Sequence, residues 1–210
     1  MKKRVLCFGD SNTWGYDAVS DGRFDDTVRW TGLLSDMLKK THTIIEEGLS
    51  GRTCVFEDPL NEGLNGLPYL QPCMMSHSPL DYLIVMLGTN DCKERFCATP
   101  GNIADGMKRL LRKAIQTPAW RDSSRILLIC PAPIPPQCEH SRVAQEMGAC
   151  SHKSEELSRE YLRCANELGI KFWDSREVVT MNQVDFMHFD APSHRRFAEK
   201  VAGILEDWEN

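Results

Sequence analysis

The feature that most constrains this chain is the alternation of short apolar runs with amphipathic segments along its whole length. The runs are nearly all apolar, which is typical of parallel strands covered on both faces. The predicted strands are residues 4–8, 43–45, 82–87, 125–130 and 170–173. Apolar residues at helical spacing predict helices within residues 30–38, 103–111, 157–168 and 197–208. Such alternation predicts an α/β fold.

We expect a three-layer α/β/α sandwich with a flavodoxin-like parallel sheet of about five strands, in the order 2-1-3-4-5. No repeat or linker divides the chain, so a single domain over residues 1–210 is expected. Two stretches, residues 57–79 and the proline-rich residues 131–150, are predicted to be irregular. Long loops of this kind usually shape a binding site or pack against a neighbouring subunit. Asp190, followed by Ala191 and Pro192, predicts the start of the last helix.

Charge and cysteine usage restrict the partners and the compartment. The net charge of −5, without a basic stripe, argues against a nucleic-acid partner. No apolar run reaches the length of a membrane span, and the apolar stretch at residues 5–8 is too short for an export signal. Nine cysteines at irregular spacing predict reduced thiols and no disulfide framework. We therefore expect a cytoplasmic protein without membrane or nucleic-acid partners.

Two polar motifs follow predicted strands directly. Gly9-Asp-Ser-Asn12 follows the first strand, and Gly88-Thr-Asn-Asp91 follows the third. Ligands of an open parallel sheet bind beyond the carboxyl ends of its strands, where the strand order reverses. These two strands are neighbours in the predicted order, so Ser11 and Asn90 are expected to face the same crevice.

A third motif supplies a base for a serine nucleophile. Serine hydroxyls react poorly unless a neighbouring base takes their proton. Asp185-Phe-Met-His188 places a carboxylate and an imidazole three residues apart, just before the last helix. At that spacing the carboxylate can reach the imidazole Nδ1, fix its tautomer and stabilise the cation. The three motifs predict Ser11, His188 and Asp185 as a catalytic triad.

Together with a fourth block, these motifs resemble the GDSL-type hydrolases of the SGNH superfamily. The four blocks appear in order as Gly9-Asp-Ser-Asn12, Gly48-Leu-Ser-Gly51, Gly88-Thr-Asn-Asp91 and Asp185-x-x-His188. One departure is Asn12, which stands where the family usually has leucine. The chain is most similar to the bacterial arylesterase/acyltransferase branch, in residues 28–32, 46–53 and 86–91. Four motifs in the right order are a much stronger signal than one.

The resemblance implies a role for each matching residue. Ser11 attacks the ester carbonyl, His188 takes its proton and returns it to the departing alcohol, and Asp185 holds His188. The backbone N–H groups of Ser11 and Gly51 and the side-chain amide of Asn90 form the oxyanion hole. The branch also implies a homo-oligomer that acts on small-molecule esters. These roles are physically sound, because glycine permits close backbone approach and an amide is a neutral donor.

Simpler structural explanations exist for most of these residues. Ser11 can cap a helix and Asn90 can stabilise a turn. Asp10 and Asp91 fit loop-bracing carboxylates. We name Asn12, Trp14 and Tyr16 as candidate residues of the substrate pocket, although aromatic residues after a strand often serve only packing.

The other histidines compete weakly with His188 for the role of base. Asp190 and His194 lie at the start of the last helix, where capping and surface exposure explain both. His42 and His77 have no partner that the sequence identifies, so both are expected at the surface or in loops.

Metal and cofactor sites are not expected. Cys138-Glu-His140 and Cys150-Ser-His152 resemble loose metal ligation, but their spacing matches no zinc pattern. A serine triad needs no metal and no cofactor.

The leading hypothesis is a serine esterase that cleaves short-chain, acetyl-like esters through an acyl-enzyme and can transfer the acyl group to alcohols. A carbohydrate O-deacetylase would use the same triad. A flavodoxin-like nucleotide or phosphate binder is the alternative from another class, although the chain lacks G-x-x-x-x-G-K-[ST] and G-x-G-x-x-G. A protein that has lost its activity is disfavoured by the intact set of blocks.

Overall fold

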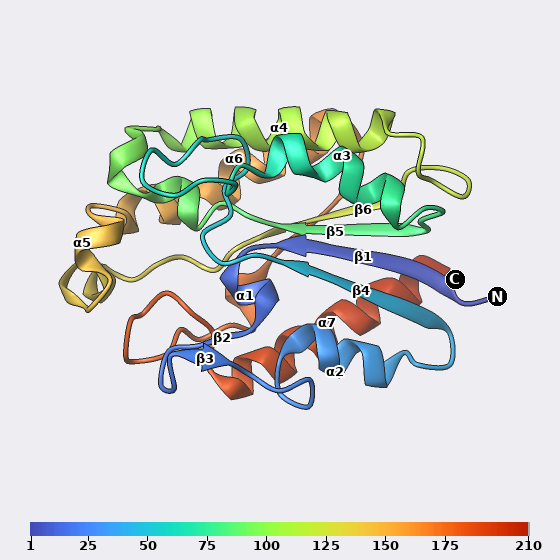
Figure 1. The fold of residues 1–210 in the computed structure, drawn as a ribbon, viewed down its shortest axis with the longest axis horizontal. Coiled ribbons are helices and arrows are strands. Elements are labelled where there is room, and N and C mark those ends of the chain that lie inside the picture. Colours follow the sequence, from blue (N-terminus) through green and yellow to red (C-terminus); the bar gives the residue numbers. More distant parts are fainter. Residues whose placement is uncertain (210) are drawn as a thin grey trace.

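The computed structural model describes residues 1–209, and Asn210, the last residue of the predicted domain, lies outside the described residues. A five-stranded parallel sheet forms the centre, in the order β4-β1-β5-β6-β7 (Figure 1). Counted along the chain, this is the predicted order 2-1-3-4-5. The strands are β1 (Lys3–Gly9), β4 (His42–Gly48), β5 (Tyr82–Met86), β6 (Ile126–Cys130) and β7 (Lys171–Asp174).

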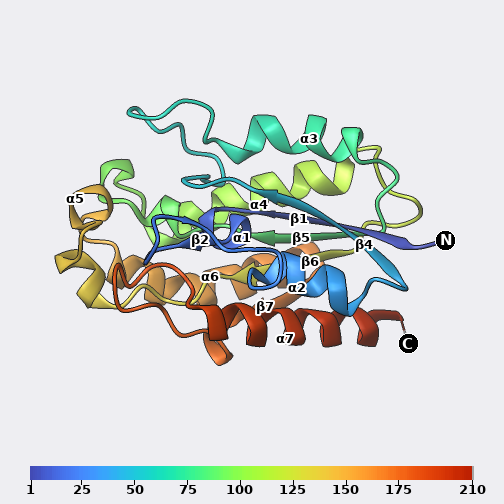
Figure 2. The ribbon, with the colours of Figure 1, turned by 60° about the horizontal axis from the view of Figure 1, so that its bottom comes forward.

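Helices cover both faces of the sheet, which confirms the three-layer architecture (Figures 1 and 2). Alternate side chains of β1 point to opposite layers, as the pleat requires. Leu6 and Phe8 enter one core, whereas Val5 and Cys7 enter the other. One layer holds α3 (Gly66–Ser76), α4 (Pro100–Gln116) and α6 (Ser151–Leu168), and the other holds α2 (Trp30–Met37) and α7 (Ala191–Glu209).

Short elements gather at the carboxyl end of the sheet, on the left of Figure 1. The antiparallel pair of β2 and β3 was not predicted. These elements are α1 (Ser11–Trp14), β2 (Tyr16–Asp17), β3 (Gly22–Arg23), η1 (Asn90–Cys92), η2 (Glu94–Phe96), η3 (Pro136–His140), α5 (Ala144–Met147) and η4 (Ser175–Glu177). No helix in the described part of the chain is long and apolar enough to cross a membrane.

The prediction that residues 57–79 are irregular is wrong in its second half. Helix α3 occupies Gly66–Ser76, capped by the Asn65 side chain, which accepts the Leu67 N–H at 3.0 Å. Its interior Pro72 has no N–H to donate and disfavours helix in a sequence reading. Tertiary packing on the sheet outweighs that cost, since the Leu70 and Met74 side chains are fully buried.

One strand is longer than predicted, and the second irregular stretch is confirmed. Strand β4 is longer than predicted, because its last residues include Glu46 and Glu47 and carry no apolar signal. As an edge strand paired only with β1, β4 can expose such side chains. Residues 131–150 are mostly irregular, as predicted, and contain only η3 and the single turn α5.

Candidate active site

Ser11 is held at the tip of β1 by a tight turn into α1. The Asp10 carboxylate caps this turn and accepts the Asn12 N–H at 3.0 Å. Gly9 is required just before it, since a Cβ there would lie 2.0 Å from Thr13 Oγ1 and 2.9 Å from the Met86 carbonyl oxygen. The Ser11 side chain is thereby fixed in a buried position beyond the sheet.

The turn from Asp185 to His188 is organised around one carboxylate. Asp185 Oδ1 accepts the N–H groups of Met187 and His188 at 2.9 and 3.1 Å, and the Asn182 side-chain amide at 2.8 Å. Phe186 adopts a left-handed φ of 60°, which closes the turn. Asp185 Oδ2 then lies 2.8 Å from His188 Nδ1.

His188 and Ser11 meet across almost the full length of the chain. His188 Nε2 lies 2.9 Å from Ser11 Oγ. Asn12 supports this contact, because its amide donates to the Met187 carbonyl at 3.3 Å and its Oδ1 accepts the Phe189 N–H at 2.9 Å. The three predicted side chains are therefore brought together in hydrogen-bonding order.

The environment keeps Asp185 ionised. Burial alone would raise the pKa of Asp185, but the hydrogen bond and charge of His188, with donors from Met187 and Asn182, hold that pKa well below its usual range. An ionised carboxylate accepts the proton on His188 Nδ1, which leaves Nε2 as an acceptor for the serine proton. The arrangement can activate the Ser11 hydroxyl as a nucleophile.

Asn90 and Gly51 lie on the loops beside this serine. The Asn90 side chain is buried at the start of η1, and its Nδ2 donates to the Arg52 carbonyl at 3.2 Å. Gly51 has a φ of +84°, and a Cβ there would lie 2.8 Å from Leu64 Cδ1, so only glycine fits without strain. The Arg52 guanidinium donates to the Gly9 carbonyl at 2.9 Å. These bonds fasten the Gly51 loop to the end of β1.

Two buried carboxylates brace the same loops, as the sequence predicts. Asp91 accepts the Cys54 N–H at 2.8 Å, and Asp10 caps α1. Burial raises the pKa of Asp10 to about 6 and that of Asp91 to about 7. Both carboxyl groups are therefore partly protonated near neutral pH.

The three predicted pocket residues lie at different distances from the catalytic side chains. Asn12 is buried, and its side chain holds the turn described above. Trp14 is half-buried under the Arg23 guanidinium, 5.2 Å from the ring centroid. Tyr16 lies closest to the chemistry, with its ring centroid 4.4 Å from that of His188.

The surface or loop positions predicted for His194 and His42 are wrong, whereas His77 lies half-buried in the turn after α3, in line with its prediction. His194 is fully buried, its Nδ1 accepts the Trp30 N–H at 3.2 Å, and burial lowers its pKa to about 4. His42 is also buried, with Nδ1 2.9 Å from Thr41 Oγ1. His77 has a partner that the sequence could not reveal, since its Nε2 lies 2.9 Å from Glu47 Oε1. The contacts of His194 and His77 join residues far apart in the sequence, whereas His42 contacts its neighbour Thr41.

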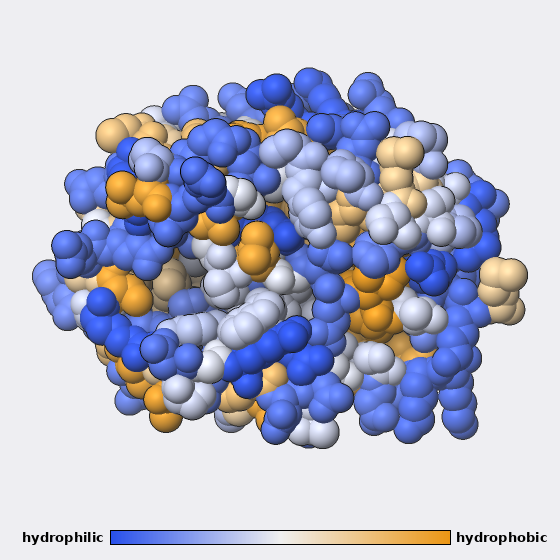
Figure 3. Space-filling view, in the orientation of Figure 1, coloured by the Kyte–Doolittle hydropathy of each residue, from blue (hydrophilic) through white to orange (hydrophobic). Residues whose placement is uncertain are grey.

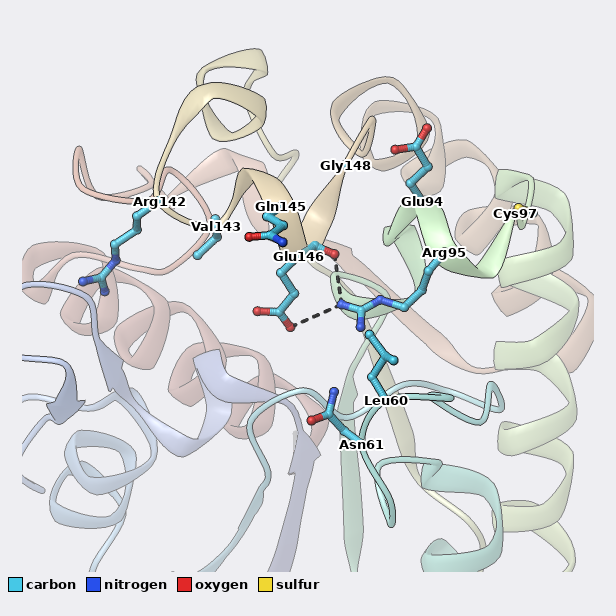
Figure 4. Close-up of a pocket in the computed structure, with 10 residues that line it drawn as sticks. All are labelled: Leu60, Asn61, Glu94, Arg95, Cys97, Arg142, Val143, Gln145, Glu146 and Gly148. Atoms are coloured by element: carbon cyan, nitrogen blue, oxygen red, sulfur yellow. Dashed lines mark hydrogen bonds and ion pairs between the residues drawn. The ribbon is translucent and has the colours of Figure 1, made fainter.

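A cavity of about 830 Å³ lies between three loops at the carboxyl end of the sheet (Figure 4). In Figure 3 the surface is hollowed beside α5. Arg142 points away from the other lining residues and donates to the Tyr16 hydroxyl at 3.0 Å, which links the cavity wall to the ring packed on His188. The lining residues are Leu60, Asn61, Glu94, Arg95, Cys97, Arg142, Val143, Gln145, Glu146 and Gly148.

Ion pairs join the three loops around this cavity. The buried Lys93 ammonium lies 2.6 Å from Glu146 Oε1 and 3.9 Å from Asp58 Oδ2. Arg95 lies 3.5 Å from Asp58 Oδ1 and donates to the Glu146 backbone carbonyl at 3.0 Å. The sequence missed these residues, although it assigned residues 57–79 and 131–150 to a binding site or a subunit contact.

The cysteine–histidine cluster considered in the sequence does not assemble. His152 is exposed and pairs with Glu156 at 3.3 Å, whereas the Cys138 and Cys150 thiols are buried against each other. Within residues 1–209, one set of three side chains has the spacing of metal ligands, and it consists of Glu47, Cys73 and His77.

Comparison with known proteins identifies similar chains. The model of the GDSL-like lipase/acylhydrolase family matches residues 7–196. The chain is similar to an aryl esterase from M. smegmatis, with 37% identity, coverage of 98% and 99% of the two chains, and a TM-score of 0.91. A carbohydrate acetylesterase from Sinorhizobium meliloti has 34% identity, 99% and 100% coverage, and a TM-score of 0.88.

A more distant structure shares the fold alone. It is a member of the lipolytic protein G-D-S-L family from Veillonella parvula, with 16% identity, 97% and 98% coverage, and a TM-score of 0.69. No curated protein matches the chain.

Proposed function

The chain belongs to the GDSL-like lipase/acylhydrolase family and is a carboxylic ester hydrolase, and from this premise we propose that it cleaves short-chain, acetyl-like esters through an acyl-enzyme on Ser11. The observation that carries the proposal is the relay of two hydrogen bonds, 2.9 Å from Ser11 Oγ to His188 Nε2 and 2.8 Å from His188 Nδ1 to Asp185 Oδ2. The family match overturns the alternative of a nucleotide or phosphate binder without esterase activity.

Acylation begins when Ser11 Oγ attacks the ester carbonyl carbon. His188 Nε2 takes the serine proton, and ionised Asp185 stabilises the imidazolium that forms. Charge then develops on the carbonyl oxygen, and the N–H groups of Ser11 and Gly51 with the Asn90 amide are the donors we assign to it. Collapse of this intermediate breaks the bond to the alcohol, which leaves with the proton from His188.

Deacylation repeats these steps with water or another alcohol as the attacking group. His188 takes the proton of the attacking hydroxyl, and Ser11 Oγ is the leaving group that recovers it. Water gives hydrolysis, whereas a second alcohol gives acyl transfer. The same residues serve both outcomes, so the balance depends on access of water to the acyl-enzyme.

Short acyl groups fit the close packing around Ser11. Its side chain is buried and in contact with His188. We assign the alcohol portion to the cavity, whose wall is connected to the site through Arg142 and the Tyr16 ring packed on His188. The cavity wall is rich in charged and amide side chains, among them Arg95, Arg142 and Glu146. A polar wall supports the second candidate, an acetylated carbohydrate, since sugars need hydrogen-bonding partners.

The experiment compares p-nitrophenyl acetate, p-nitrophenyl octanoate and an acetylated sugar as substrates of the wild type and Ser11→Ala. We expect the acetate to exceed the octanoate in kcat/KM, and both activities to vanish in the variant. Equal rates for wild type and Ser11→Ala would overturn the mechanism. Faster turnover of the octanoate would overturn the choice of acyl group. Comparing kcat/KM for the acetylated sugar with that for p-nitrophenyl acetate decides between a sugar and an aryl alcohol portion.

We also propose that copies of the chain associate beside the cavity. Leu60, which lines the cavity, is 74% exposed, and Val19 in the turn between β2 and β3 is 79% exposed. Large apolar side chains this exposed favour burial against another surface. Light scattering is expected to give a multiple of the 23.9 kDa chain mass, and Leu60→Asp is expected to shift it toward the single chain. A wild-type mass of one chain would overturn this proposal.

A further inference from the structure

Three side chains of different chemistry meet where α3 lies beside the edge strand β4. The ligand atoms of Glu47, Cys73 and His77 all lie within 4.8 Å of one another. None of the three takes part in the arrangement of Ser11, His188 and Asp185. The set combines a carboxylate, a thiol and an imidazole, which is a combination that ester chemistry does not require.

The helix presents its part of this set on one face. Tyr69, Cys73 and His77 are spaced four residues apart, so they lie one above another along α3 and at its end. The backbone of His77 is fixed, because its N–H donates to the Cys73 carbonyl at 3.2 Å and its carbonyl accepts the Arg4 guanidinium at 3.1 Å. His77 is thereby held toward β4.

The strand supplies the carboxylate, and a neighbour orients it. Glu47 is the residue before the end of β4, and its Oε2 accepts the Tyr69 hydroxyl at 3.0 Å. Its other oxygen, Oε1, faces His77 Nε2 at 2.9 Å. A hydrogen bond to one carboxylate oxygen, with the other turned toward the site, is the outer support that metal-binding carboxylates commonly have.

We propose that Glu47, Cys73 and His77 form a binding site for a borderline-soft divalent cation of the Zn²⁺ type. Thiolate, imidazole and carboxylate are the three ligand classes that zinc accepts, whereas Mg²⁺ and Ca²⁺ require mostly oxygen ligands. Cys73 is buried, while His77 and Glu47 are half-buried and reachable from solvent. The site therefore offers three protein ligands and leaves the fourth position to water.

The charges of the site favour the ion but limit its affinity. A Cys73 thiolate and the Glu47 carboxylate would neutralise a divalent ion. Burial, followed by the charge of Glu47, raises the pKa of Cys73 to about 12, so the ion must displace a thiol proton, as zinc does. The Arg52 guanidinium, 5.2 Å from the centroid of the Tyr69 ring, is a nearby like charge. We expect a dissociation constant on the order of 1 µM, weaker than that of a four-ligand zinc finger.

Binding at this place would tie α3 to β4 without entering the reaction. Strand β4 ends at Gly48, and the chain continues directly to Gly51 beside Ser11. An ion that binds only the folded chain stabilises it by mass action. The inferred ion has a structural role, and it departs from the expectation of a chain without a metal site.

The test is a titration of the chelator-treated protein with Co²⁺, which takes zinc geometry and is visible by absorption. We expect a thiolate-to-cobalt charge-transfer band that saturates at one ion per chain and disappears when Zn²⁺ is added. Cys73→Ser should abolish that band, and His77→Gln should weaken binding at least about tenfold. Zn²⁺ should also raise the Tm of the wild type and leave that of Cys73→Ser unchanged.

Matched controls separate this site from other thiols and histidines. Cys97→Ser removes the exposed thiol and His152→Gln removes an exposed imidazole, and both should keep the cobalt band. Far-UV circular dichroism checks the fold of each variant, and the half-buried His77→Gln serves where Cys73→Ser folds poorly. A wild type without a saturable thiolate band, or a band that survives both Cys73→Ser and His77→Gln, would overturn the proposal.

Discussion

Two regions at the carboxyl end of the sheet are held together by different forces. The strand-end region contains Ser11, Asn90 and the turn from Asp185 to His188, and it is buried and joined by hydrogen bonds. The cavity rim contains residues 57–65, 93–97 and 142–148, and it is joined by ion pairs, in which Lys93 and Asp58 are buried and half of the Glu146 side chain is exposed.

The two regions are expected to have different roles in catalysis and in substrate choice. Buried hydrogen bonds with fixed geometry keep reacting atoms in place, which catalysis requires. The rim lies on loops, which tolerate changes of side chain and of length, except at the buried Lys93–Asp58 pair. We therefore expect substitutions in the strand-end region to reduce turnover of every ester, and substitutions in the rim to change stability or the choice of alcohol.

The largest effect is expected for Ser11→Ala in the strand-end region. Without the nucleophile, kcat for p-nitrophenyl acetate should fall by about 10⁴–10⁶. Adding His188→Ala should cause little further loss, because the two residues act as one unit. Steady-state kinetics of both single variants and the double variant measure this. Losses that multiply would contradict the relay through His188.

Asn90→Ala tests the oxyanion assignment in the same region. Removal of one donor should lower kcat by about 10²–10³ with a small change in KM. Asn182→Ala is the comparison, since its amide contacts Asp185 and not the reacting oxygen. Kinetics on p-nitrophenyl acetate distinguish the two, and an Asn90→Ala enzyme with wild-type kcat would remove Asn90 from the oxyanion hole.

Lys93→Met tests whether the rim depends on its buried charge. Loss of the ammonium leaves the buried Asp58 with Arg95 alone, so the free energy of unfolding should fall by about 3 kcal/mol. Urea unfolding measures this change. Lys39→Met, at an exposed pair with Asp36, is the control and should stay near the wild type. Equal stability of the two variants would mean that the ion pairs of Lys93 do not stabilise the rim.

Arg142→Ala should alter alcohol selection. Arg142 lines the cavity, and its guanidinium contacts the Tyr16 hydroxyl beside His188, so we expect kcat/KM for a bulky polar alcohol ester to fall about tenfold. Methyl acetate, which leaves the cavity empty, should be turned over at nearly the wild-type rate. An equal loss for both esters would mean that Arg142 affects turnover in general, as expected of the strand-end region. That result would contradict the proposed difference between the two regions.

The smallest effect concerns the pH dependence of stability. The folded-state pKa of Asp91 is raised to about 7 by burial, so the folded chain binds a proton that the unfolded chain releases. Stability should therefore rise by about 1 kcal/mol as the pH falls from 8 to 6. Asp91→Asn should flatten this rise in urea unfolding curves at the two pH values. A slope unchanged in the variant would assign the effect to another group, with Asp10 next to test.

The strand-end region was predictable from the sequence because it is built from local signals. Apolar runs predicted the strands, and Ser11 and Asn90 lie in the motifs directly after two of these strands. The spacing of Asp185 and His188 lies within one turn, so their contact required no knowledge of the rest of the fold.

The rim and the partners of His77 and His194 were less predictable because these contacts are tertiary. The residues next to Lys93 in the sequence give no sign that its ammonium group is buried. Its partners Asp58 and Glu146 are far away along the chain. Helix α3 was missed because Pro72 weakens its local signal, and the partner of His77 lies on an edge strand.

The central claim is that Ser11 carries the acyl group during turnover. The most direct measurement is intact-protein and peptide mass spectrometry after rapid acid quenching of the enzyme with p-nitrophenyl acetate. We predict one added acetyl group per chain on the peptide that contains Ser11, and none in Ser11→Ala. An acetyl group on another residue, or the same labelling in Ser11→Ala, would contradict the account.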